Sequence, residues 1–169
     1  MTTYKTDRLL IRPTATDDAA FILELLNSPK WLQFIGDRKV RDLKDAENYI
    51  NNRIISQYNK IGFSNFTVLR KSDSVKMGVC GIYEREGLED FDLGFAFLPQ
   101  FEQMGYAFEA AKKILELGLN EFKIKKICAI TTKDNFSSQK LLKKLGFNFE
   151  KLVKIEGDSE ELMLYLISV

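Results

Sequence analysis

The order of strand-like and helix-like segments along the chain constrains its fold more than any other sequence feature. Apolar patterns predict strands near residues 7–12, 63–70, 75–84, 90–98, 125–132, 148–156 and 160–168, with amphipathic helices between several of them. Turns join three pairs of consecutive strands, whereas helices precede the strand near 63–70 and separate the strands near 90–98, 125–132 and 148–156. The resulting β-α-α-β-β-β-α-β-α-β-β order favours an α+β fold, with a mixed central sheet flanked by helices.

Local signals refine this order. Thr14 or Thr16 is expected to cap the first helix, and Asp42 is expected to cap the second. Residues 30–41 lack clear periodicity and are expected to form an irregular, aromatic-rich connection. Gly94 lies in the middle of a predicted strand, which suggests a β-bulge or a close approach of another part of the chain.

Length and composition favour a single domain over residues 1–169. Lys and Arg total 25 against 24 Asp and Glu, so the net charge of +1 provides no bulk basic surface for nucleic acid. The first residues lack the apolar core of a signal peptide, and no stretch approaches the roughly 18 apolar residues of a membrane span. We therefore expect a cytoplasmic protein without a membrane or nucleic-acid partner.

The absence of histidine excludes several kinds of catalytic site. A histidine base, a His-ligated zinc and a Ser-His-Asp triad are all excluded, and no metal site is expected. Cys80 and Cys128 are far apart and lie in apolar, strand-like runs. They are expected to be buried small side chains, with a reactive thiol as the alternative.

A strand, a loop and a glycine-led helix follow one another over residues 93–107. A helix that opens on Gly105 leaves its first amides unpaired, and the helix dipole favours an anion there. Gly105 also allows a ligand to approach the backbone closely. The segment therefore suggests a phosphate-binding turn, with an ordinary strand-to-helix turn as the alternative.

A second pattern covers residues 134–147. Asn135 is expected to cap a helix, Leu141 and Leu145 to pack inward, and Gly146 to end the helix. This arrangement is structurally complete without a ligand. Its functional meaning depends on the pattern that precedes it.

Together, the two patterns resemble the GNAT superfamily of acyl-CoA N-acyltransferases, and within it the RimJ/RimL-like branch, which acetylates protein N-termini and other amines. The resemblance is carried by Leu93-Gly94-Phe95, Gly105-Tyr106-Ala107-Phe108-Glu109-Ala110, Asn135-x-x-Ser138-x-x-Leu141-x-x-x-Leu145-Gly146-Phe147 and the opening Thr6-Asp7-Arg8-Leu9-Leu10-Ile11-Arg12-Pro13. It extends over essentially the whole chain. It implies a GNAT fold in which a bulged strand and its parallel neighbour splay apart.

The resemblance also implies where acetyl-CoA, the cosubstrate, would bind. Pantetheine would lie in the gap between the splayed strands and pair with their backbone, and the pyrophosphate would meet the amides at the start of the following helix. The implied cofactor-binding residues are Phe95, Ala96, Phe97, Gln103, Met104, Gly105, Tyr106, Ala107, Asn135 and Ser138.

For catalysis, the resemblance implies that Ser138 donates a proton to the leaving sulfur and that Asp92 is the general base, with Glu84 and Glu86 as alternative bases. Trp31 and Phe34 are candidates to line the mouth for the acceptor amine, or else they plug the core.

The sequence departs from the family pattern at two places. The turn before Gly105 carries Glu102, Gln103 and Met104, where the family usually has a Gln or Arg, a basic residue and a further glycine. An acidic Glu102 beside a pyrophosphate is unfavourable unless it points to solvent. Leu142 stands where many relatives place a tyrosine.

The function implied is transfer of an acetyl group from acetyl-CoA to a primary amine by a monomer or homodimer. A catalytically weak acyl-CoA-binding module is the alternative, and a nucleotide-phosphate-binding domain is the interpretation without the resemblance.

The pKa of the acceptor amine bears on the class of substrate. Keeping an amine neutral at pH 7 costs about 1 kcal/mol for an α-amine and about 4.6 kcal/mol for lysine. Without histidine, the chain is expected to use a low-pKa amine, either a peptide N-terminus or a small amino compound.

Overall fold

The computed structural model describes residues 2–168, which form one eight-stranded sheet flanked by helices. The strands are β1 (Tyr4–Lys5), β2 (Leu9–Pro13), β3 (Asn65–Arg70), β4 (Lys76–Tyr83), β5 (Phe91–Phe97), β6 (Lys126–Thr131), β7 (Asn148–Val153) and β8 (Leu162–Ser168). The α-helices are α1 (Ala19–Leu26), α2 (Pro29–Phe34), α3 (Leu43–Tyr49), α4 (Ser56–Ile61), α5 (Tyr106–Asn120) and α6 (Phe136–Lys144). Shorter segments are the 3-10 turns η1 (Thr16–Asp18) and η3 (Pro99–Phe101) and the π-helical segment η2 (Ile50–Ile55), which joins α3 to α4.

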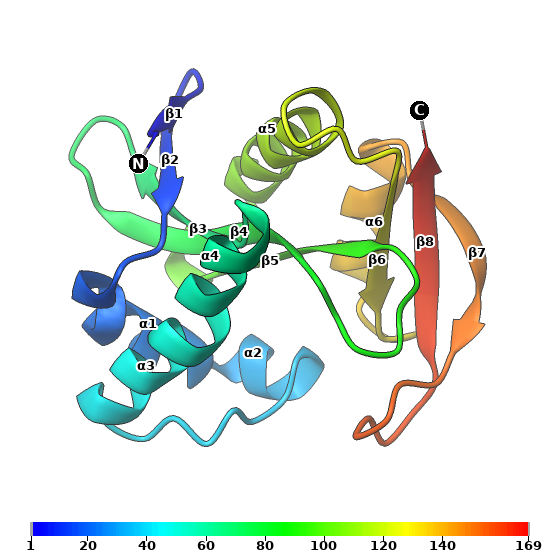
Figure 1. Cartoon of the computed structure of the whole chain (residues 1–169), viewed down its shortest axis with the longest axis horizontal. Coiled ribbons are helices and arrows are strands. Elements are labelled where there is room, and N and C mark those ends of the chain that lie inside the picture. The colour runs from blue at the N-terminus through cyan, green and yellow to red at the C-terminus, as the bar shows by residue number, and fades with distance from the viewer. Residues whose placement is uncertain (1, 169) are drawn as a thin grey trace.

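The sheet has the order β1-β2-β3-β4-β5-β6-β8-β7, and its one parallel pair is β5 with β6. That pair is short. Phe91 lies opposite Ile127 and Asp92 opposite Cys128, and no later residue of β5 is paired with β6. The two strands therefore diverge after their first residues, as the sequence predicted. Figure 1 shows β6, β8 and β7 grouped beside α6, apart from β1, β2 and β3 on the other side of the molecule.

Two apolar clusters pack on the opposite faces of the sheet. The larger cluster includes Leu93 and Phe97 of β5, together with residues of α5 and α6. The smaller cluster joins α1 and α3 to Val79 and Leu98, and Ala96 packs against it. Because side chains alternate along a strand, Asp92 lies on the same face as Ala96, beside the N-terminal helices.

The predicted element order is confirmed, with differences at the N-terminal end. Residues 30–41 contain the helix α2, for which Pro29 at the first helical position favours helix initiation. Neither Thr14 nor Thr16 caps the first helix. Thr14 instead bonds to Thr67 on β3, and the chain turns through Ala15 into η1.

Asp42 caps α3 as predicted, because its carboxylate accepts a hydrogen bond of 2.8 Å from the amide of Asp45. The expected bulge in β5 is absent, since the register between β4 and β5 is continuous. The alternative, a close approach to Gly94, is confirmed. A Cβ at this position would lie 2.9 Å from Cε2 of Tyr83, so glycine leaves room for that ring.

Candidate active site

The diverging half of β5 presents an unpaired backbone edge. The Leu98 amide donates to the Met77 carbonyl on β4 at 2.9 Å. Because backbone groups alternate in direction along a strand, the amides and carbonyls of Phe95 and Phe97 point to the opposite edge, toward β6. Ala96 turns its backbone toward Val79 instead, so only its side chain remains for contact with a ligand. The edge offered by Phe95 and Phe97 is one onto which an extended ligand can add as a further strand.

The turn that follows β5 exposes backbone amides at the start of α5. Gly105 is the N-cap residue with φ of 81°, and Gln103 also adopts a left-handed conformation with φ of 58°. The first helical bond is donated by Glu109 to the Gly105 carbonyl. Within residues 2–168, the amides of Tyr106 and Ala107 have no hydrogen-bond acceptor, and the dipole of this 15-residue helix favours an anion there.

The charge on Glu102, which the sequence placed beside this turn, is neutralised from another element. The Glu102 carboxylate accepts a hydrogen bond of 2.6 Å from the ammonium of Lys30 on α2. The same turn exposes the side chain of Met104, and Gln103 is exposed as well. The turn is therefore open to solvent, and the charge of Glu102 is paired with that of Lys30.

The second predicted motif forms the start of α6. Asn135 caps this helix, its side-chain oxygen accepting from the Ser138 amide at 3.2 Å. The Gln139 side chain ties the helix to the preceding loop through the carbonyls of Thr132 and Lys133. The hydroxyl of Ser138 has no hydrogen-bond partner among the described residues. It is half-buried at the N-terminal end of α6, on the helix that packs beside β6.

Asp92 occupies the position at which β5 and β6 part. Its side chain is 1% exposed, and its Oδ2 accepts a hydrogen bond of 2.8 Å from Arg85 Nε. Burial raises the pKa of Asp92 above its usual value, although the charge and hydrogen bond of Arg85 oppose this shift. The second oxygen, Oδ1, is buried without a partner within residues 2–168.

Unsatisfied buried polar atoms also occur on β6. Thr131, the last residue of the strand, has a buried hydroxyl without a partner among the described residues. Burying a hydroxyl or a carboxylate oxygen without a hydrogen bond is costly. The open edge of β5 and the free amides before α5 together fit an extended polar ligand that ends in an anion.

The two aromatic residues expected at the acceptor mouth lie on α2. Trp31 packs partly buried against the smaller apolar cluster, on the face of the sheet that also carries Asp92. Its ring nitrogen is buried without a partner in the part of the chain that the structure describes. Phe34 is half-buried on the same helix. Whether these rings contact an acceptor stays a prediction.

Both cysteines are buried, as expected. Burial raises the pKa of Cys80, and burial together with the nearby Asp92 and Asp90 raises the pKa of Cys128 to about 12. Neither thiol is therefore ionised near neutral pH, which argues against the reactive-thiol alternative.

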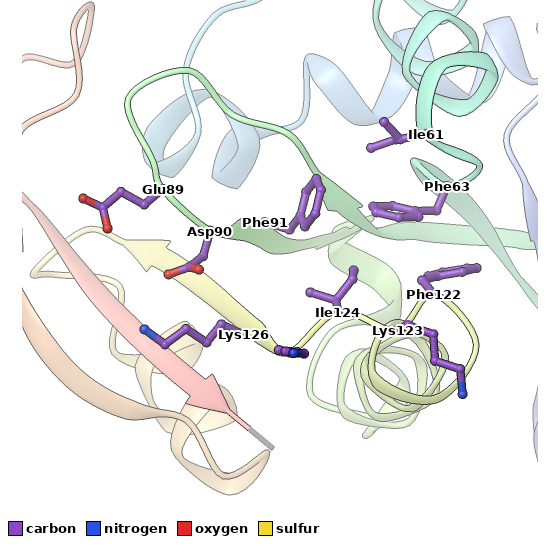
Figure 2. A pocket seen from close by; sticks show the side chains of 10 residues that line it. Ile61, Phe63, Glu89, Asp90, Phe91, Phe122, Lys123, Ile124 and Lys126 are labelled. Atoms are coloured by element: carbon purple, nitrogen blue, oxygen red, sulfur yellow. The ribbon is translucent and has the colours of Figure 1, made fainter.

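A separate hollow of about 600 Å³ lies at the paired ends of β5 and β6 rather than in the gap. Figure 2 shows Phe63, Phe91 and Phe122 on one side of it, with Glu89, Asp90 and Lys126 on the other. Phe63 stacks on Phe122 at 4.8 Å and meets the edge of Phe91 at 5.2 Å. These rings close the end of the main apolar cluster, so this hollow is distinct from the site described above.

Among residues 2–168, no three or more His, Cys, Asp or Glu side chains gather as a metal site would require. No described helix is both long enough and apolar enough to cross a membrane.

Sequence reasoning missed three charged residues of the site. Lys30 and Arg85 pair with Glu102 and Asp92, and Arg8 lies against the turn before α5. Lys30 lies 72 residues from Glu102 in the chain, and Arg8 lies 96 residues from Met104. Arg85 is only 7 residues from Asp92, so this is the one pair that spacing in the sequence could have suggested.

Comparison with known proteins identifies the family to which the chain belongs. Residues 8–148 match the family described as acetyltransferase (GNAT) domain. The chain is 28% identical over 149 residues to the uncharacterized N-acetyltransferase YnaD of Bacillus subtilis, covering 88% of this chain and 84% of YnaD. A GNAT-family acetyltransferase structure from Bacillus anthracis matches with a TM-score of 0.81 at 25% identity, covering 99% of this chain and 98% of that one. A ribosomal-protein-S5-alanine acetyltransferase structure from Vibrio fischeri shares the fold with a TM-score of 0.76 at 16% identity, covering 99% and 97%.

Proposed function

Because the chain belongs to the GNAT acetyltransferase family, we propose that it transfers the acetyl group of acetyl-CoA to a primary amine. The observation that carries this proposal is the divergence of β5 from β6 after Asp92, which leaves the backbone edge of Phe95 and Phe97 open beside the glycine-led start of α5. We propose that residues 1–169 act as one domain. A cytoplasmic location would suit an enzyme that draws on the acetyl-CoA of the cell.

Pantetheine would pair with the backbone of Phe95 and Phe97, and the pyrophosphate would accept from the amides of Met104, Gly105, Tyr106 and Ala107. Gln103, exposed at the tip of the turn, would contact the same end of the cosubstrate. Ala96 would contribute only its side chain. Asn135 would contact the pantetheine arm with its side-chain amide nitrogen, since the oxygen already caps α6.

The two faces of the sheet would divide the reaction. Asp92 lies on the face of the N-terminal helices, whereas α5 and α6 cover the other face. The amine would approach from the Asp92 side, and its nitrogen would attack the thioester carbon directly in a ternary complex. As the C–N bond forms and the C–S bond breaks, the nitrogen would lose a proton to Asp92 and the leaving sulfur would gain one from the Ser138 hydroxyl. Solvent would then return a proton to Ser138 and take the proton from Asp92, which restores both groups.

Two features support Asp92 as the base over Glu84 and Glu86. Burial raises its pKa, which strengthens it as a proton acceptor, and its Oδ1 has no competing partner. Glu84 is ion-paired with Lys60 at an exposed site, and Glu86 lies in the loop between β4 and β5. Ser138 is supported by its free hydroxyl on the opposite side of the gap.

The acceptor we propose is a low-pKa amine, either a peptide N-terminus or a small amino compound, as in the RimJ/RimL-like branch. The opening segment that resembles this branch supports the proposal, because it forms β2 and brings Arg8 to the turn before α5. Trp31 and Phe34 would line the mouth on the Asp92 side. Faster acetylation of lysine side chains or polyamines than of matched N-terminal peptides would contradict this choice.

The test is release of CoA thiol from acetyl-CoA, measured with a panel of peptides and amines. Ser138→Ala is expected to lower turnover more than tenfold while CoA binding persists, because only the proton donor is lost. Gly105→Glu is expected to abolish CoA binding, because it adds a side chain and a negative charge where the anion would lie. Binding of CoA without turnover on any amine would favour a catalytically weak acyl-CoA-binding module instead.

A further inference from the structure

Arg8 lies directly against the turn before α5, although it comes from the opposite end of the chain. Its Nη1 donates to the Met104 carbonyl at 2.9 Å, and its Nε donates to the Glu109 carboxylate at 2.7 Å. Its guanidinium carbon also lies 4.6 Å from the centre of the Tyr106 ring. Arg8 therefore contacts the residues on both sides of Gly105 and fixes the path of the turn.

The remaining nitrogen of this guanidinium points to the same glycine. Nη2 has no hydrogen-bond partner within residues 2–168, and it lies 3.2 Å from the place where a Cβ of residue 105 would stand. The Arg8 side chain is 47% exposed. A donor that is charged, free and solvent-accessible thus lies beside the exposed amides at the helix start.

The turn needs a cation from elsewhere, because it carries none of its own. Residues 99–107 contain no Lys or Arg, and two carboxylates, those of Glu102 and Glu109, flank the place where an anion would bind. Each carboxylate is neutralised by a different element. Lys30 of α2 pairs with Glu102, and Arg8 pairs with Glu109. Burial would raise the pKa of Glu109, but the hydrogen bonds from Thr6 and Arg8 hold this pKa below its usual value.

We propose that Arg8 replaces the basic residue missing from the turn and binds the diphosphate of acetyl-CoA. It would hold the Met104 carbonyl out of the anion's way, neutralise Glu109 and present Nη2 to a phosphate oxygen. Arginine suits this task because its planar fork can serve several acceptors at once. The proposal rests on the proposed function, since it names the residue by which that site recognises its cosubstrate.

The test is calorimetric titration of CoA into the unaltered chain and an Arg8→Gln variant. We expect Arg8→Gln to weaken CoA binding at least tenfold and to raise the KM for acetyl-CoA, with kcat at saturation little changed. Turnover of S-acetylpantetheine, which lacks the diphosphate, should not change. Arg41→Gln is the matched control, because it removes an arginine ion pair with Asp37 on an exposed loop, and it should bind CoA like the unaltered chain.

Glu109→Gln in the Arg8→Gln background separates electrostatics from a structural role. Removing the unpaired carboxylate should restore part of the lost CoA affinity, whereas a purely structural role would leave affinity low or lower it further. Should Arg8→Gln fail to fold, Arg8→Lys decides the matter. Lysine can pair with Glu109 but cannot also serve Met104 and the anion, so CoA binding should weaken several-fold.

Unchanged CoA affinity in the Arg8 variants would overturn this inference and leave the proposed function standing. An equal loss of activity with S-acetylpantetheine would also overturn it, because the defect would not depend on the diphosphate. Failure of the unaltered chain to bind CoA would overturn the proposed function and this inference together.

Discussion

Among residues 2–168, two side-chain carboxylates are buried, and their hydrogen-bond partners differ sharply in number. Asp18 is 0% exposed and accepts hydrogen bonds from Arg12, Thr67 and the Ala15 amide, with Lys76 2.7 Å from Oδ1. Asp92 is 1% exposed, yet Arg85 is the one described side chain that donates to it, and its Oδ1 has no partner of good hydrogen-bond geometry among the described residues.

The difference shows in the acidity of the two groups. Burial would raise the pKa of Asp18, but its hydrogen bonds to Arg12 and Lys76 overcome that effect and hold the pKa well below its usual value. For Asp92, burial prevails over Arg85 and the backbone amide of Ile130, and the pKa is raised. A fully satisfied buried charge stabilises a fold, whereas a half-satisfied one retains the capacity to accept a proton.

Asp92→Asn provides the strongest test of this contrast. If Asp92 is the base, the change should lower kcat by about 10²–10⁴-fold, the usual range for a general base. The free energy of unfolding should fall less than in Asp18→Asn, because the change leaves one cation, Arg85, without its carboxylate instead of two. Acetyl transfer and chemical denaturation of the same preparation measure both quantities. A large loss of stability with normal turnover would assign Asp92 to the fold.

Asp18→Asn should have the reverse effect. Removing one partner of a buried ion pair typically costs about 3–5 kcal/mol, and here it would leave Arg12 and Lys76 without their shared carboxylate. Chemical denaturation should show the loss. The turnover of the fraction that remains folded should stay close to that of the unaltered chain, and a specific loss of kcat would show that the two carboxylates are not separated in role.

Arg85→Gln should make Asp92 still less acidic. Arg85 opposes the rise in the pKa of Asp92, so its removal should shift the acid limb of the rate profile to higher pH. At neutral pH we expect a loss of about tenfold or less, recovered as the pH is raised. A loss of rate that does not depend on pH would place Arg85 in another role.

The pH dependence of stability offers the smallest effect, with opposite signs at the two sites. The lowered pKa of Asp18 means that its stabilising contribution is present above about pH 4 and is lost as the pH falls. The raised pKa of Asp92 means that ionisation of this group costs stability as the pH rises above about 4. Asp18→Asn should therefore flatten the acid-side loss of stability, and Asp92→Asn should steepen it. If the free energy of unfolding varied with pH in the same way in both variants, the two carboxylates would not differ in acidity as proposed.

Apolar periodicity and helix caps predicted the element order because they act over a few residues, whereas the divergence of β5 from β6 was predicted from the family resemblance. Asp42 and Asn135 cap their helices as expected, each through its own neighbours in the chain. Of the two alternatives expected at Gly94, the bulge was wrong and the close approach was confirmed. The glycine makes room for the ring of Tyr83 on the adjacent strand, a contact that a single sequence does not display.

Like the fold, the candidate site could be predicted only where it depends on residues close together in the chain. Gly105 and Asn135 could be found because they form short, ordered motifs, whereas Arg8 and Lys30 act on residues far along the chain. Glu102 looked unfavourable in the sequence because its partner on α2 could not be foreseen. Likewise, Asp92 was a candidate from its position, but its unpartnered oxygen depends on how β5 and β6 separate.

The most direct test of this account is a crystal structure of the chain with bound CoA. We expect pantetheine to lie between β5 and β6, paired with the backbone of Phe95 and Phe97, and the diphosphate to lie at the amides around Gly105. A gap filled by the protein's own side chains, with CoA bound elsewhere or not at all, would contradict the account.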